Sequence, residues 1–261
     1  MRNAIALLAL ILLCNHIQAQ IVNTEELRFN ATDKSFIGLV DVSFAVVRNK
    51  AGVSLRPGAD LRFEWTKGKT RWMTLGGYKL SRFTNLNRPG ALPTNFTNKG
   101  FLHFRYNRQL SQKVTWEIFS QAQFDEIQEI DIRLLNGMGP RFELAQSDST
   151  SLYFGVLYMY EYEETSDEPE IITYNKDNRL SSYISLNHQF NEFVGFSNIT
   201  YFQPNLSDFA DYRISVKTLF TARFSKTTAL NIKIDFVYDN RPPETVPEAM
   251  FDMSTGLSVV F

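Results

Sequence analysis

The chain has 261 residues, with 27 lysines and arginines against 28 aspartates and glutamates. This balance disfavours a nucleic-acid-binding protein, which usually presents a basic face. Apolar residues make up 44% of the chain and aromatic residues 14%, a composition that excludes simple disorder and is enough for one large all-β domain.

Residues 1–19 have the features of a secretory signal peptide. Arg2 supplies a positive charge, an apolar core follows over residues 4–13, and Ala19 is a small residue suited to cleavage. The apolar core is too short for a membrane-spanning helix, which takes about 20 residues. We therefore predict that residues 1–19 are removed on export and that residues 20–35 form a short periplasmic N-terminal segment ahead of the folded domain.

Cys14 is the only cysteine, and it lies inside this predicted signal. Leu13 precedes it where a lipoprotein would carry a small residue, so lipidation is disfavoured. Small exported domains normally depend on disulfides. A closed β-barrel does not need them, because its backbone groups pair around the sheet.

From residue 36 onward, apolar and polar residues alternate. Leu102 and Phe104 share one face of a segment, for example, and His103 and Arg105 share the other. A period of two residues indicates β-strands, and no long stretch has a helical period. We expect twelve strands, near residues 36–48, 55–66, 70–82, 101–110, 114–126, 131–144, 151–163, 179–190, 194–203, 211–224, 229–240 and 251–261.

The connectors between these segments alternate in length. Short connectors alternate with mostly longer ones, as expected of outer-membrane barrels with tight turns at one end and longer loops at the other. The connector at 127–130 is short although it belongs to the long-loop side. The short connectors are 67–69, 111–113, 191–193 and 225–228; the longer ones are 83–98, 164–178, 204–210 and 241–250.

Alternation alone does not separate a membrane barrel from a soluble β-sandwich. Strand length favours the barrel, because these segments run about 10–13 residues whereas ordinary strands have about 5–6. Ten tilted residues cover roughly 23 Å, close to the apolar band of about 25 Å in outer-membrane barrels. The polar face is also charged on nearly every segment.

Aromatic residues near strand ends and the final residue add to this interpretation. The chain stops on an alternating segment closed by Phe261, which is similar to the C-terminal signal that the barrel assembly machinery reads. We predict an all-β fold, a transmembrane antiparallel up-and-down β-barrel of about 12 strands over residues 36–261, in contact with outer-membrane lipid and lipopolysaccharide. The candidate girdle residues are Trp65, Trp72, Tyr78, Tyr106, Tyr160, Tyr162, Tyr201, Tyr212 and Tyr238.

Four stretches carry a resemblance to a known family: VNTEELRF, FLHFRYNRQLSQKVTWEIFSQAQFDE, DIRLLNGMGPRFEL and LSSYISLNHQF. In these stretches the chain resembles a bacterial domain family of unknown function labelled as salt-induced outer membrane proteins. The resemblance runs from Val22 to Phe261 and implies an outer-membrane barrel. It implies no catalytic residue and no cofactor.

If the apolar face meets lipid, the charged face lines the lumen. Opposite charges on neighbouring strands then either fill the interior as a structural plug, in a non-conducting or envelope-stress barrel, or line a narrow pore for small solutes. Arg213, Lys217, Arg223 and Lys233 lie on two adjacent segments and would make the pore weakly anion-preferring. The lumen candidates are Arg62, Arg105, Arg133, Arg141, Glu143, Arg213, Lys217, Arg223, Lys233 and Asp235.

Two groups of acidic residues are expected in outer loops, where they either bind divalent cations or are simply solvated. The spacing matches no defined calcium loop. The groups are Glu161, Glu163, Glu164, Asp167, Glu168 and Glu170, and Asp125, Glu126, Glu129 and Asp131.

An enzyme is disfavoured. Outside the signal the histidines are His103 and His188, and neither falls in a recognisable nucleophile motif. A lipid hydrolase at the barrel rim remains the weakest of the three functional hypotheses, and no metal or other cofactor is expected.

Overall fold

The computed structural model describes residues 35–88, 90, 92–168, 171–225, 228–243 and 246–259. They form a single antiparallel sheet of twelve strands, which confirms the predicted number. The predicted signal peptide, nearly all of the N-terminal segment and Phe261 lie outside the described residues. The strands are β1 (Phe36–Arg48), β2 (Gly52–Lys67), β3 (Thr70–Asn85), β4 (Thr94–Gln109), β5 (Val114–Asp125), β6 (Ile130–Gln146), β7 (Thr150–Glu168), β8 (Ile171–Gln189), β9 (Val194–Pro204), β10 (Tyr212–Arg223), β11 (Thr228–Asp239) and β12 (Ala249–Val259).

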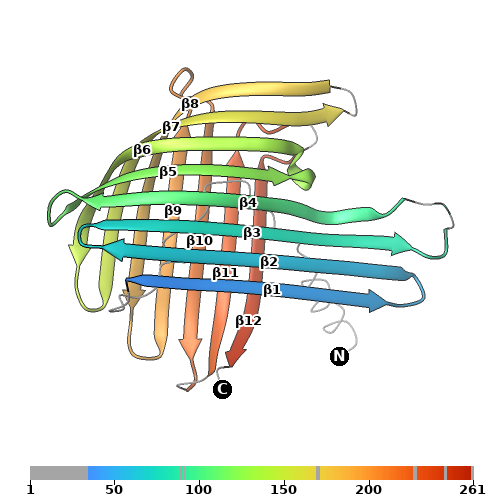
Figure 1. The fold of residues 1–261 in the computed structure, drawn as a ribbon, viewed down its shortest axis with the longest axis horizontal. Coiled ribbons are helices and arrows are strands. Elements are labelled where there is room, and N and C mark those ends of the chain that lie inside the picture. The colour runs from blue at the N-terminus through green and yellow to red at the C-terminus, as the bar shows by residue number, and fades with distance from the viewer. Residues whose placement is uncertain are drawn as a thin grey trace.

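The topology is up-and-down, because each strand pairs with the next along the chain. Figure 1 shows how the sheet curls: β1–β7 run across the front, and β9–β12 cross behind them at a steep angle. Within the described part of the chain, no pairing joins the two edge strands, β1 and β12. An even number of alternating strands makes these edges antiparallel, which is the relation that closure of a barrel requires.

One predicted loop is wrong. Residues 164–168 and 171–178 are strand rather than loop, because β7 and β8 stay paired out to Glu168 and Ile171. Thr165, Thr173 and Tyr174 are good strand formers that continue the ladder. The acidic content of this stretch therefore misled the sequence interpretation.

The only helical segment in the described ranges is η2 (Glu126–Gln128), a single 3-10 turn between β5 and β6. Its first N–H groups are capped by Asp125, whose side chain accepts from the amide of Ile127 at 3.1 Å. No helix of the described residues has the length and apolarity needed to cross a membrane.

The two faces of the sheet differ in chemistry. Residues directly opposite one another in neighbouring strands share a face, so the register runs from Met73 through Arg105 to Phe119 along one row of the inner face. These three are buried, whereas Leu102 and Phe104, on the outer face of β4, are exposed. The inward side is thus buried and rich in charge, and the outward side is apolar and exposed.

Candidate functional site

The register places all ten predicted lumen residues on the inner face. Their burial is unequal around the sheet. Arg105, Arg133, Arg141, Arg213 and Lys217 are buried, Arg62, Glu143 and Asp235 are half-buried, and Arg223 and Lys233 are exposed. The inner face is therefore the candidate functional site, and it is closely packed over β4–β10.

One buried node centres on Glu117 of β5, whose side chain is fully buried. Its carboxylate accepts a hydrogen bond from the hydroxyl of Tyr183 at 2.6 Å. The guanidinium groups of Arg105 and Arg141 lie 3.6 and 3.7 Å from it. A desolvated carboxylate is tolerated in this setting because the Tyr183 hydroxyl and two positive charges compensate it.

A second node centres on Glu161 of β7. Arg213 donates to its carboxylate at 2.5 Å, and Arg179 lies 3.7 Å away. Arg213 also donates to Asp239 at 2.5 Å. Because these partners come from β7, β8, β10 and β11, the node ties together strands on both sides of the curl.

The neighbouring Glu163 forms an ion pair with Arg133, at the same end of the molecule. Glu161 and Glu163 are both buried, so our expectation that they belong to a solvated outer loop is wrong. The reason is parity: in a strand that continues to Glu168, odd-numbered residues of β7 point inward. The side chains of Asp167, Glu168 and Glu170 lie outside those described.

The β9–β10 connection contributes two further residues, Asn205 and Asp211, to the second node. Arg179 donates to Asp177 and Asp211 at 3.0 Å each, and Asn205 donates to the same two carboxylates. Sequence reasoning did not select Arg179, Asp211 or Asp239. Strand parity, once the register is known, places Arg179 and Asp239 on the inner face, whereas Asp211 is brought to Arg179 by the β9–β10 connection.

The basic strip proposed on β10 and β11 is interleaved with acidic residues. Arg213 stands directly opposite Asp239, and Lys217 directly opposite Asp235. Arg223 and Lys233 lie farther along the same face, toward the tight-turn end. Positive and negative charges therefore balance around Arg213 and Lys217, whereas the part of the strip around Arg223 and Lys233 has a net positive charge.

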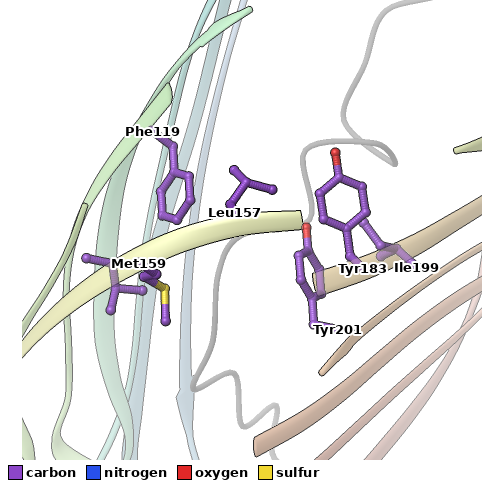
Figure 2. Packing of buried hydrophobic residues seen from close by; sticks show 7 residues of the cluster. Phe119, Leu157, Met159, Tyr183, Ile199 and Tyr201 are labelled. Carbon is purple, nitrogen blue, oxygen red and sulfur yellow. The ribbon is translucent and has the colours of Figure 1, made fainter. Parts of the chain in front are cut away.

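The inner face also contains an apolar cluster that the sequence did not predict. It consists of Phe119, Leu135, Leu157, Met159, Tyr183, Ile199 and Tyr201. Figure 2 shows Phe119 and Met159 on one side, Leu157 between, and Tyr183, Ile199 and Tyr201 on the other. Tyr201 is 1% exposed, so its predicted place in an outer aromatic girdle is wrong. Apolar side chains at inward positions were hidden by the stronger apolar pattern on the outward side.

Several glycines make this packing possible. A Cβ on Gly137 would lie 2.4 Å from the ring of Phe119, and one on Gly155 would lie 2.2 Å from the ring of Tyr183. The aromatic rings thus cover the backbone of the adjacent strand, which only glycine permits.

His103 and His188 lie in separate polar settings. His103 is fully buried on the inner face, and its Nδ1 lies 2.8 Å from the side-chain oxygen of Gln121. His188 pairs through Nδ1 with the hydroxyl of Thr150 at 2.7 Å. The described ranges contain no cluster of three or more residues able to hold a metal ion.

The chain matches a protein family described as "Protein of unknown function, DUF481" over residues 57–261. This match confirms the resemblance to a bacterial domain family of unknown function. No curated protein matches the chain.

Three of the solved structures that resemble this chain are two porins and a channel. "NanC porin structure in rhombohedral crystal form" has a TM-score of 0.47 and 12% identity, covering 85% of this chain and 100% of that one. "KdgM porin in complex with disordered oligogalacturonate" has a TM-score of 0.41 and 11% identity, covering 87% and 99%. "TodX monoaromatic hydrocarbon channel deltaS2 mutant" has a TM-score of 0.41 and 10% identity, covering 87% and 79%.

Proposed function

We propose that this chain, which belongs to the DUF481 family, is an outer-membrane β-barrel whose lumen admits small solutes. The proposal includes contact with outer-membrane lipid and lipopolysaccharide. It also includes recognition by the barrel assembly machinery during insertion.

The observation on which the proposed membrane location mainly rests is the apolar outer face. Leu102, Ile118, Met138, Ile184 and Phe202 come from five different strands, and each is at least 40% exposed. Water-soluble monomers rarely expose contiguous apolar surface of this extent. Charged groups occupy the inner face of β4, β5, β6 and β8, so the molecule has the polarity of a protein whose outside meets hydrocarbon.

Aromatic residues on the outer face add support. Trp65 and Trp72 stand opposite each other, and Tyr106 stands opposite Trp72, all near the tight-turn end. The rings of Trp72 and Tyr106 are 4.3 Å apart between centroids. Amphipathic rings of this kind favour the boundary between hydrocarbon and headgroups.

The solute path is proposed along the part of the inner face that the packed cluster leaves open. Asp60, Lys79 and Lys233 are exposed there, on β2, β3 and β11. Both signs of charge are present, which suits a narrow aqueous pore. The weak preference for anions rests on Arg223 and Lys233 at the tight-turn end.

Single-channel recording in planar bilayers tests the proposal. Purified protein should give small current steps, and a salt gradient should shift the reversal potential in the direction of anion selectivity. Arg223→Gln should reduce that shift, whereas Arg108→Gln, on the exposed outer face of β4, should leave it unchanged. Protein that inserts without any current would refute the channel.

A non-conducting structural barrel is the second candidate, and a specific observation favours it. The nodes at Glu117 and Glu161, together with the apolar cluster, fill the inner face between β4 and β11. If closure brings β1 and β12 against this packed half, no continuous water path remains. Inserted but silent protein would then be the expected result.

A further inference from the structure

A polar cavity of about 260 Å³ lies on the inner face at the tight-turn end, apart from the β10–β11 strip. Consecutive strands contribute its wall: Arg71 from β3, Asn107 from β4, Thr115 from β5, Arg141 from β6 and Tyr153 from β7. Strand pairing sets Asn107 directly opposite Arg71 and Arg141 directly opposite Thr115. The cavity is therefore built by the strand register.

The charge of this cavity is positive. Lys69, Arg71, Lys113 and Arg141 line it against the single carboxylate of Glu143, so four positive charges oppose one negative charge. Two further carboxylates stand behind the wall. Glu64 pairs with Arg71, and Glu117 lies between Arg105 and Arg141. With these and Arg105 included, five basic groups still oppose three acidic ones.

The donors in the wall are held in place. The guanidinium carbon of Arg141 lies 3.7 Å from the centre of the Tyr153 ring, and only 3% of the residue is exposed. Arg71 is anchored through one terminal nitrogen by Glu64, while its Nε has no hydrogen-bond partner within the described structure. A planar guanidinium in a fixed orientation is suited to the paired oxygens of an oxyanion.

Asn107 provides an independent indication of a ligand. Its side chain is 5% exposed, lines the cavity, and has an amide oxygen without a hydrogen-bond partner in the described part of the chain. Buried polar groups are nearly always satisfied by protein, water or a ligand. An acceptor beside guanidinium donors suits a protonated oxyanion, which carries both O⁻ and O–H.

We propose that this cavity binds a small oxyanion of the inorganic phosphate class, which enters from the tight-turn end. The volume is below the roughly 300–1,000 Å³ of sites for drug-sized ligands, so a small ion fits and a nucleotide does not. The site does not depend on conduction through the lumen. In a conducting barrel it would hold anions at the mouth of the pore.

Isothermal titration of the purified, detergent-folded protein with inorganic phosphate tests the site, in chloride of constant ionic strength. Saturable binding near one phosphate per chain is expected. Arg71→Gln should weaken it about tenfold, the loss of one charge-assisted contact, and the double change Lys69→Gln with Lys113→Gln should weaken it further because it removes two positive charges. Glu143→Gln should strengthen binding, because it removes the one carboxylate that faces the ligand.

Arg108→Gln is the matched control, since Arg108 lies on the outer face at the same end, next to the position opposite Arg71. It should bind phosphate as the unchanged protein does. Faster gel migration of unheated samples would verify that each variant is folded. Absence of saturable binding, or equal losses in Arg71→Gln and Arg108→Gln, would overturn the site. Binding without current would refute the channel alone, and current without binding would refute this site alone.

Discussion

At the scale of single residues, the close contact between glycines and rings on the inner face decides how the interior packs. Tyr183 covers Gly155 and is held at its far end by the hydrogen bond to Glu117. The ring is thus fixed at both ends and cannot move aside for a new side chain. Packing and polar pairing are coupled at this position.

Replacing Gly155 by alanine should therefore destabilise the protein by about 1–3 kcal/mol, the usual cost of overpacking. The measurement is the urea dependence of unfolding in lipid vesicles. Gly256→Ala is the control, because a Cβ there meets no atom within 4 Å. Equal unfolding midpoints for the two variants would show that Tyr183 is free to move.

Glu161 is the residue on which the second ionic node depends. Glu161→Gln leaves Arg213 and Arg179 buried with one carboxylate fewer. Removing one partner of a buried ion pair costs about 3–5 kcal/mol, so a large drop in the free energy of unfolding is expected from the same urea measurement. Asp148→Asn, at an exposed turn, serves as the comparison and should change it little.

At the scale of elements, closure of the sheet into a barrel requires the two edge strands, β1 and β12, to pair with each other. Unpaired backbone N–H and C=O groups cost several kcal/mol each in hydrocarbon, so membrane insertion strongly favours pairing between the two edges. Val42 of β1 and Phe251, Met253 and Leu257 of β12 point to the outer face by register.

Cysteine cross-linking measures this closure. Val42→Cys should form a disulfide with a cysteine introduced at one of the three outer-face positions of β12, because only one stagger fits the barrel. Cys14, the single native cysteine, is replaced by serine in this background. Failure of every pair in membrane-inserted protein would mean that the sheet remains open.

An ion pair joins the β9–β10 loop to the β11–β12 loop, at the end of the sheet opposite the tight turns. Asp208 accepts from the amide of Ala210 at 3.0 Å and from Arg241 at 2.7 Å. The backbone hydrogen bond first, and the guanidinium second, hold the pKa of Asp208 below its ordinary value. A carboxyl with a lowered pKa contributes its interaction above the ordinary value of about 4, and loses it as the pH falls through the lowered value.

Acidification should therefore release the loop at residues 205–211. Cleavage there by an acid-active protease is expected to rise as the pH drops through the lowered pKa of Asp208. Asp208→Asn should be cleaved equally at all pH values in that window. A pH step that survives in this variant would assign the change to another group.

At the scale of the whole molecule, membrane insertion tests the prediction that Phe261 is part of an assembly signal. Phe261→Ala should reduce the amount of protein inserted into the outer membrane several-fold, because the closing aromatic is the feature that resembles an assembly signal. Phe251→Ala, which changes an aromatic residue on the outer face of β12, should insert normally. The readout is the folded, heat-modifiable fraction in isolated membranes. Insertion unaffected by the loss of Phe261 would refute its role.

The sequence by itself determined the strands, their alternating faces and their number. Leu102 and His103 differ in the side that they face because successive residues of an extended chain point in opposite directions, a purely local rule. The family also followed from sequence alone. Local rules failed where strands extend beyond their apolar pattern, as in residues 164–168 and 171–178, and where inward apolar residues such as Leu157 and Tyr201 pack against one another.

Only the tertiary structure decided which inward residues meet. Glu161, Arg179, Arg213 and Asp239 are far apart in the chain, and their contacts depend on the stagger of five paired strands and on how the sheet curls. The cavity at Arg71 and Arg141 likewise exists only once the strands between them are aligned. A sequence specifies which side chains each strand presents on its two faces. Which side chains meet across the interior depends on the register of every strand pair and on the curvature of the whole sheet.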